Sequence, residues 1–171
     1  MKDQLSTREA IRSLYELYSN DIYRYAGITL DDSSEAYDVV QEVFLRAYRS
    51  WNSYRQQAYA KTWLMSIARN YMIDLHRKHQ AHAKNLSASE LTDDVADRSP
   101  SMYLIPIVQN GLQQLKVEYR EAIILRFMEN LSVAETAAVL GWSENKVRNA
   151  THRGLQKLRE VLREVNGQDE I

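Results

Sequence analysis

Residues 130–157 read NLSVAETAAVLGWSENKVRNATHRGLQK, and this stretch decides the architecture of the C-terminal half. Ser132 followed three residues later by Glu135 forms a capping box, which predicts that a helix begins directly after the serine. Gly141 is placed to end that helix, and Ser143 can cap another one. A short helix, a turn containing glycine and a second helix predict a helix-turn-helix, whose second helix enters the major groove of DNA.

The second helix of this unit has one apolar and one basic side when it is drawn at 100° per residue. The apolar stripe comprises Val147, Thr151, Gly154, Leu155 and Leu158. The outward positions, with Arg148 at their flank, are Asn145, Lys146, Asn149, His152, Arg153 and Gln156. Arginine and asparagine can read guanine and adenine edges, and lysine meets phosphates, so this side is predicted to contact DNA. The alternative is a helical hairpin whose basic side meets only solvent.

The segments before the helix-turn-helix divide the chain into two halves. Apolar residues recur near a 3.6-residue period and predict an amphipathic helix or a pair of helices: Leu112, Leu115, Tyr119, Ile123 and Phe127. Residues 83–103 lose all periodicity and are rich in serine, aspartate and alanine, which is typical of a flexible linker. We therefore predict an all-α protein with helical domains at 1–82 and 104–171, the last six residues forming a frayed tail.

A helix is predicted over 34–50 in the N-terminal half. Its apolar side holds Ala36, Val40, Val43, Ala47 and Trp51, with Phe44 at the edge. Its opposite side holds Asp38, Gln41, Glu42, Leu45 and Arg49. A single exposed leucine is common, so the pattern alone favours a solvated face over a protein-docking face.

A second helix is predicted over 61–82, after a loop over 50–60. Its core stripe comprises Trp63, Leu64, Ile67, Ala68, Tyr71 and Leu75, whereas Arg69, Asn70, His76 and Arg77 fall outside it. Asp74 is placed to pair within the helix with Arg77 or Lys78. Trp51, Tyr54 and Tyr59 lie near Arg55 and Lys61, a mixture that suits stacking on unpaired bases, although these aromatics can equally be core.

The composition excludes several classes of protein. The chain has 171 residues with 5 glycines and 2 prolines, so turn residues are scarce and long helices are favoured. The absence of cysteine excludes disulfides and cysteine nucleophiles. No apolar run approaches the roughly 20 residues that span a bilayer, and the N-terminus has no signal core. We expect a cytoplasmic protein without direct membrane insertion.

The charges are unevenly distributed although their formal sum is only −1. Residues 146–163 contain six basic side chains and one acid, and residues 69–78 contain three basic side chains and one acid. Between them, residues 90–97 contain four acids and no basic residue. This pattern fits two DNA-binding surfaces as well as it fits two solvated helix faces.

No motif points to catalysis or to a bound metal. His76, His79 and His82 recur every three residues, but Asp74 is the only carboxylate close to them in sequence. A glycine-rich phosphate loop and a recognisable serine, histidine and aspartate set are both missing from the sequence. We therefore expect a protein that is not an enzyme, with no catalytic residue, metal or cofactor.

Taken together, these segments resemble the extracytoplasmic-function sigma factors of the bacterial sigma-70 superfamily, and the resemblance covers nearly the whole chain. Residues 38–44 are similar to region 2.2 of that family. Residues 63–70, with Asp74 and Arg77, are similar to regions 2.3 and 2.4. The similarity to region 4 lies in Tyr119-Arg120-Glu121-Ala122, Leu131-Ser132, Glu135, Leu140-Gly141 and His152-Arg153.

The resemblance implies a role for each group of residues. Contacts to the β′ clamp helices of core RNA polymerase would come from Asp38, Gln41, Glu42, Phe44 and Leu45. Capture of a flipped base and contacts to the −10 element would come from Tyr54, Arg55, Lys61, Arg69, Asn70, Arg77 and Lys78. Contacts to the −35 element would come from Asn145, Lys146, Arg148, Asn149, His152 and Arg153. The resemblance further implies a σ2-like and a σ4-like domain, promoter DNA and the polymerase β flap as partners, and restraint by an anti-sigma factor.

The recognition helix departs from the family pattern at several positions. Asn145-Lys146 stands where a Gly-Thr pair is frequent, Ala150 where a second basic residue is usual, and Gly154 where alanine is usual. These departures leave the −35 sequence unassigned. Two other classes fit the residues: a one-component helix-turn-helix regulator with an N-terminal sensing domain, and a helical adaptor that binds only protein.

Overall fold

The described part of the chain is built from helices joined by short loops. The computed structural model describes residues 2–30, 32–54, 59–85 and 106–167. The α-helices are α1 (Lys2–Thr29), α2 (Ala36–Ser50), α3 (Ala60–Asn85), α4 (Pro106–Gln113), α5 (Val117–Ile123), α6 (Val133–Leu140) and α7 (Glu144–Gly167). Short 3₁₀ turns at Ser33–Glu35 and Trp51–Ser53 flank α2, and a π-helical turn at Ile124–Met128 follows α5. No strand occurs in these ranges, so the all-α prediction is confirmed.

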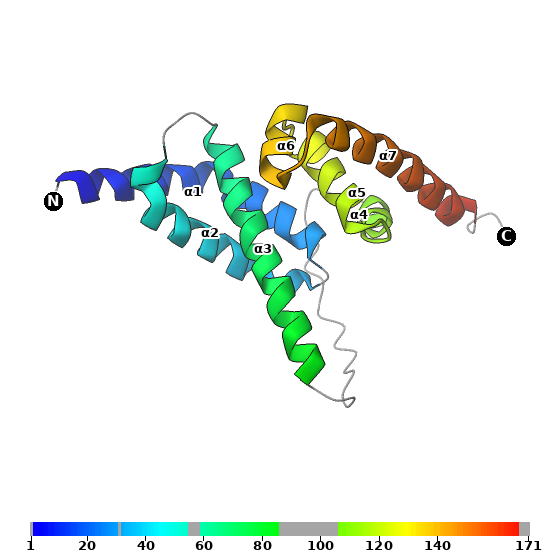
Figure 1. Ribbon diagram of the computed structural model, residues 1–171, viewed down its shortest axis with the longest axis horizontal. Coiled ribbons are helices and arrows are strands. Elements are labelled where there is room, and N and C mark those ends of the chain that lie inside the picture. The colour runs from blue at the N-terminus through cyan, green and yellow to red at the C-terminus, as the bar shows by residue number, and fades with distance from the viewer. Residues whose placement is uncertain (1, 31, 55–58, 86–105, 168–171) are drawn as a thin grey trace.

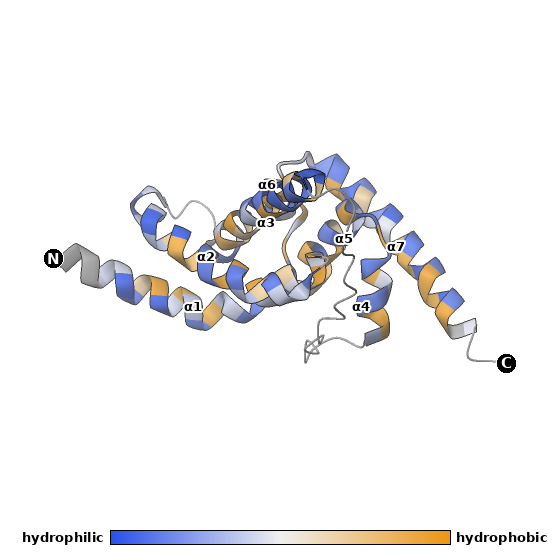
Figure 2. Ribbon diagram, turned by 90° about the horizontal axis from the view of Figure 1, so that it is seen from below, coloured by the Kyte–Doolittle hydropathy of each residue, from blue (hydrophilic) through white to orange (hydrophobic). Residues whose placement is uncertain are grey.

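The N-terminal half is a bundle in which α3 crosses α1 and α2 (Figure 1). Four positions of the predicted apolar side of α2 are confirmed, because Ala36, Val40, Val43 and Ala47 are buried. Trp51 lies in the turn after α2 and is partly buried, and Val39, which the predicted side omitted, is fully buried. Figure 2 shows polar and apolar positions side by side along α1, α2 and α7, as expected of helices with one buried face. None of the described helices is long and apolar enough to cross a membrane.

Helix α3 differs from its prediction in length and in the number of faces it buries. It begins at Ala60 and continues to Asn85, so it extends three residues into the predicted linker. Beyond Leu64 and Ala68, it also buries Thr62, Met65 and Met72, which the predicted stripe omitted. The reason is that α3 packs against α1 and α2 and also against α6. The rest of the predicted linker, 86–103, lies outside the described residues.

The predicted helix-turn-helix is confirmed in its local chemistry. The Ser132 hydroxyl accepts a hydrogen bond from the Glu135 amide at 3.0 Å, and the Glu135 carboxylate accepts one from the Ser132 amide at 2.7 Å. Gly141 ends α6 with φ of 67°, a left-handed conformation that costs glycine little. The Ser143 hydroxyl then accepts from the Lys146 amide at 3.2 Å and caps α7.

The apolar positions before α6 form a pair of helices, α4 and α5, and not one continuous helix. The π-helical turn after α5 inserts an extra residue per turn, so the 3.6-residue pattern no longer predicts the buried positions. Phe127 is consequently 52% exposed, although its spacing predicted a core residue. Asn130 follows in a left-handed conformation, with φ of 57°, which asparagine tolerates better than most residues.

The apolar stripe of α7 needs two corrections. Leu155 is 37% exposed, whereas Ala150, which the predicted stripe did not include, is buried. Gly154 packs directly against α5: a Cβ atom there would stand 2.9 Å from Ile123 Cδ1 and 3.0 Å from Tyr119 Cβ. Gly154, where the family usually has alanine, therefore lies at a close contact between α7 and α5.

Replacing Gly154 by alanine is expected to destabilise the fold by up to about 2 kcal/mol. Overpacking costs about 1–3 kcal/mol and outweighs the gain of about 1 kcal/mol in helix propensity. Urea unfolding followed by circular dichroism measures the difference. The matched control is Gly167→Ala, because nothing lies within 4 Å of a Cβ atom at that position. A Gly154→Ala protein as stable as the parent would contradict the close contact.

Candidate functional site

One side of α2 presents a leucine among acidic and amide side chains. Asp38, Gln41 and Leu45 are exposed, and Glu42 is partly exposed and accepts a hydrogen bond from Arg46 at 2.8 Å. Their spacing of three or four residues places them on one stripe. Phe44 does not belong to this surface: it is 7% exposed and makes an edge-to-face contact with Tyr15 at 4.9 Å. Helix α1 covers this ring, so Phe44 lies on the buried side of α2, and its role in docking stays a prediction.

An aromatic cluster joins the end of α2 to the start of α3. Tyr54 stacks on Trp63 with ring centres 4.4 Å apart and an angle of 22° between the rings, and Trp51 lies beside both. Trp63 is only partly buried, so the cluster forms an aromatic surface at the edge of the bundle. Tyr59 is exposed, and Arg55 lies outside the described residues. Sequence reasoning had placed Trp63 in the core and missed its part in this surface.

The α3 residues expected at the −10 element fall into two groups. Asn70, Arg77 and Lys78 are exposed. Lys61 and Arg69 instead lie against acidic residues of the C-terminal half. Asp74 pairs with Arg46 of α2 at 3.5 Å, so its predicted pairing within α3 is corrected to one between helices.

The Glu129 carboxylate, directly after the π-helical turn, is fully buried against two basic residues of the N-terminal half. Arg24 donates to its two oxygens at 2.8 and 2.9 Å. The Lys61 ammonium lies 3.1 Å from the carboxylate and donates to the Glu129 backbone carbonyl at 2.9 Å. Asp21 pairs with both cations, at 2.9 Å for Arg24 and 3.3 Å for Lys61. Two acids and two bases thus close a network across the two halves.

Glu121 of α5 forms a second acidic contact with the N-terminal half. Its carboxylate lies 3.3 Å from the Arg69 guanidinium and accepts a hydrogen bond from the Tyr25 hydroxyl at 3.2 Å. Burial raises the pKa of Glu121, which the charge of Arg69 partly offsets. Burial, together with the neighbouring Glu121 charge, also raises the pKa of Tyr25 well above its ordinary value.

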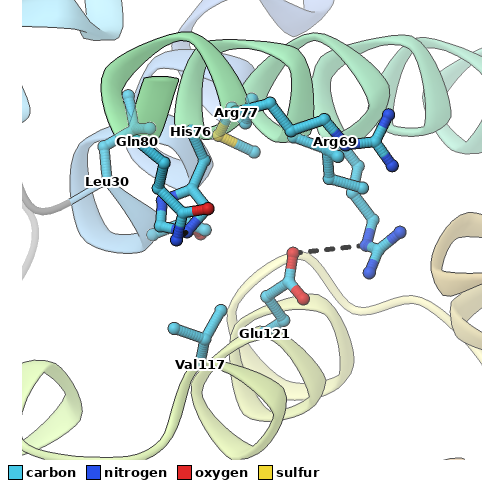
Figure 3. Close-up of a pocket in the computed structure, with 10 residues that line it drawn as sticks. Leu30, Arg69, His76, Arg77, Gln80, Val117 and Glu121 are labelled. Atoms are coloured by element: carbon cyan, nitrogen blue, oxygen red, sulfur yellow. Dashed lines mark hydrogen bonds and ion pairs between the residues drawn. The ribbon is translucent and has the colours of Figure 1, made fainter. Parts of the chain in front are cut away.

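A pocket of about 430 Å³ lies beside this contact, between α3 and α5. Figure 3 shows Arg69 and Glu121 facing each other across it, with His76, Arg77 and Gln80 on the α3 side and Val117 on the α5 side. The two halves therefore leave a hollow next to their charged contact, and basic side chains of α3 line it.

The recognition helix α7 presents all of its predicted DNA-facing residues to solvent: Asn145, Lys146, Arg148, Asn149, His152 and Arg153. Lys146 lies over the Trp142 ring at 4.3 Å and 3.6 Å from Glu118. Arg148 pairs with Glu144 at 2.9 Å. The bulky turn residue Trp142 therefore positions a lysine at the start of the helix through a cation–π contact.

The histidine series of α3 makes contacts other than those of a metal site. His79 lies 3.0 Å from the Glu35 carboxylate, and His76 shares a hydrogen bond with Gln80 at 2.9 Å. Among the described residues no group of three or more histidine, aspartate or glutamate side chains is arranged to hold a metal ion.

Comparisons with known proteins match both halves of the chain. Residues 14–82 match sigma-70 region 2, and residues 107–158 match sigma-70 region 4. The chain is 35% identical to the ECF RNA polymerase sigma factor SigX of Bacillus subtilis, over 95% of this chain and 90% of that protein. It is 31% identical to the ECF RNA polymerase sigma factor SigM of Mycobacterium tuberculosis, over 93% of this chain and 80% of that protein.

Solved structures show the same fold. The sigma factor RpoE of Bartonella quintana, in complex with the anti-sigma factor NepR, aligns with a TM-score of 0.77 and 22% identity, over 91% of this chain and 98% of that one. CnrH, in complex with the cytosolic domain of CnrY, aligns with a TM-score of 0.68 and 25% identity, over 91% and 88%.

Proposed function

The chain belongs to the extracytoplasmic-function sigma factors of the sigma-70 family, which direct RNA polymerase to specific promoters, and on that premise we propose how its parts divide the task. Residues 1–82 serve as the σ2-like domain, 83–103 as the linker and 104–171 as the σ4-like domain. The observation that carries this division is the match to regions 2 and 4 in this order, one on each helical half. Sigma factors are regulatory subunits, so the chemistry of transcription belongs to the polymerase.

The exposed basic side of α7 supports its role at the −35 element. Asn145, Lys146, Arg148, Asn149, His152 and Arg153 project from the helix that follows the turn, the position at which a helix-turn-helix meets base edges. Ala150, at the position where a basic residue is usual in the family, is buried, so this position presents no basic side chain to DNA.

Replacing Arg153 by alanine is expected to weaken −35 binding by about 1–3 kcal/mol, the usual value of an arginine contact to a base. Promoter output in reconstituted transcription, measured on templates with and without the −35 element, reports the loss. The control is Arg163→Ala, an exposed basic residue further along α7. Equal output from the parent and Arg153→Ala proteins would remove Arg153 from the −35 surface.

The aromatic cluster supports a role in opening the −10 element. Tyr54 and Trp63 offer a stacked, partly exposed surface at the end of the loop over 50–60, where an unpaired base can stack. Capture of such a base offsets the few kcal/mol of unstacking and shifts the duplex toward its open form. Asn70, Arg77 and Lys78 supply the exposed groups for the adjoining backbone, joined by Arg55, Lys61 and Arg69.

The surfaces described above also indicate which proteins the chain binds. Asp38, Gln41, Glu42 and Leu45 would dock on the β′ clamp helices of core polymerase, and the σ4-like domain on the β flap. The related RpoE chain was solved in complex with the anti-sigma factor NepR, which supports restraint of this chain by an anti-sigma factor. We place its activity in the cytoplasm, where core polymerase works.

Core-dependent promoter selection tests the proposal. Core polymerase, the chain and a genomic fragment library are combined, and the starts of the transcripts are sequenced. Starts that share spaced upstream elements only when the chain is present are the expected result. A one-component regulator would instead bind DNA on its own and leave the start sites of core polymerase unselected, so that result would replace the proposal by its alternative.

A further inference from the structure

A tryptophan, a lysine and a glutamate from three segments meet at the start of the recognition helix. Trp142 lies in the turn between α6 and α7, Lys146 in the first turn of α7 and Glu118 at the start of α5. The Lys146 ammonium lies 4.3 Å from the centre of the Trp142 ring and 3.6 Å from the Glu118 carboxylate. Lys146 stands where the family frequently has threonine, which can make neither of these contacts.

The Lys146 side chain lies at one edge of the exposed side of α7. At 100° per residue, the middle of that side holds Asn145 and Asn149, and Lys146 lies about 60° around the helix from Asn149. The Ser143 hydroxyl accepts from the Lys146 amide at 3.2 Å, so the backbone at this point is fixed by the helix cap. The edge of a helix that lies in the major groove, and its first turn above all, passes the sugar-phosphate backbone.

The ring and the carboxylate hold this ammonium in different ways. The Lys146 and Glu118 side chains are 48% and 61% exposed, so the ion pair between them is weak and exchanges readily with other anions. The Trp142 ring attracts the ammonium without neutralising its charge. A lysine that is already held in place loses less freedom when it binds an anion. A DNA phosphate can therefore replace the Glu118 carboxylate while the contact with the ring is kept.

We propose that Lys146 binds a backbone phosphate of the −35 element, that Trp142 positions it for this contact, and that Glu118 holds the same ammonium in the absence of DNA. This inference deepens the proposed function and rests on it for the identity of the DNA element. Lys146 then contributes affinity without reading sequence, and Asn145 and Asn149 in the middle of the exposed side discriminate between −35 sequences.

The salt dependence of promoter binding by the chain with core polymerase tests the phosphate contact. Each phosphate contact to duplex DNA contributes about 0.9 to the slope of log affinity against log salt concentration. Lys146→Gln is expected to lower this slope by about one, and to weaken binding by a similar factor on templates that differ only in their −35 sequence. The control is Arg163→Gln, which removes the same charge about 25 Å further along α7. An unchanged slope, or a loss confined to one −35 sequence, would overturn the phosphate contact.

A double-mutant cycle separates positioning by Trp142 from its packing. Trp142→Leu removes the ring and is expected to weaken promoter binding about threefold to tenfold when Lys146 is present, and to have little further effect in the Lys146→Gln background. Trp142→Phe keeps an aromatic ring and is expected to restore most of the affinity. If Trp142→Leu weakens binding equally in both backgrounds, Trp142 acts through packing or through its own DNA contact, and its positioning role is wrong.

Glu118→Gln removes the carboxylate that competes with DNA for Lys146. Promoter binding is expected to become about twofold to fivefold tighter, the range of an exposed ion pair. The gain is expected to disappear in the Lys146→Gln background, whereas a general effect of charge would persist there. The control is Glu160→Gln, an exposed acid of α7 that pairs with Lys157. Unchanged or weaker binding by Glu118→Gln would show that Glu118 does not compete with the phosphate.

Failure of this inference can be distinguished from failure of the proposed function. If the parent chain selects no promoter with core polymerase, the proposed function is wrong. If the parent chain selects promoters normally, but Lys146→Gln keeps the salt slope and Trp142→Leu binds as the parent does, the phosphate contact and its positioning are wrong and the sigma-factor function stands.

Discussion

Replacing Arg120 by methionine is expected to lower the free energy of unfolding by about 3–5 kcal/mol, a loss in the range that breaking a buried hydrogen-bond network causes. The Arg120 side chain is almost completely buried at the start of the σ4-like domain. Its guanidinium donates to the carbonyls of Leu112, Gln113 and Leu115 at 3.0, 2.8 and 3.2 Å. A fourth bond reaches the Thr29 carbonyl at the end of α1.

The expected loss in the free energy of unfolding follows from the hydrogen bonds that methionine cannot make. Methionine fills much of the volume but donates nothing, so the carbonyls of Gln113, Leu115 and Thr29 lose the Arg120 donor in a place that water reaches poorly, whereas the Leu112 carbonyl keeps its bond from the Leu115 amide. Urea unfolding measures the change, with Arg159→Met at an exposed position of α7 as the control expected to stay within about 0.5 kcal/mol. A loss below about 1 kcal/mol for Arg120→Met would show that these carbonyls find other donors.

The sequence predicted best what is encoded locally. The capping box at Ser132 and Glu135, the glycine stop at Gly141 and the cap at Ser143 each act over three or four residues, and each is found in the structure. The exposure of the six recognition residues also follows from one helix and its period. Such features can be predicted without knowing which other segments of the chain pack against them.

The positions that sequence analysis missed depend on contacts between distant segments. The buried second face of α3 exists because α6, some seventy residues later in the chain, packs on it. The π-helical turn after α5 breaks the period that predicted a buried Phe127. The pairing of Glu129 with Arg24 joins residues that are 105 positions apart, and no local pattern marks it.

The residues of the candidate site show the same difference between local features, which the sequence predicted, and contacts between distant segments, which it did not. Leu45 and its acidic neighbours were placed correctly on the outer side of α2. The helix period placed Phe44 at the edge of the apolar side, and it is buried against Tyr15 of α1; only the resemblance assigned it to the docking surface. Trp63 was assigned to the core from its period, whereas its ring takes part in the aromatic surface with Tyr54. The roles assigned to these surfaces remain predictions for binding experiments.

Replacing Leu45 by arginine is expected to weaken binding of core polymerase by at least about 30-fold, or about 2 kcal/mol, the loss typical of a central interface residue. Leu45 is 44% exposed on the same stripe as Asp38 and Gln41, so it is the apolar centre of a surface with a polar rim. An arginine there removes the apolar contact and changes the local charge.

The matched control is Leu17→Arg, because Leu17 is a more exposed leucine, at 66%, on α1 outside the α2 stripe. Both substitutions place the same charged side chain on a helix of the same bundle, so a general loss of solubility or stability would affect both. Competition with a labelled parent chain for core polymerase measures the two affinities. If Leu17→Arg lost as much affinity as Leu45→Arg, polymerase docking would not centre on α2, and α1 would have to contribute the apolar contact instead.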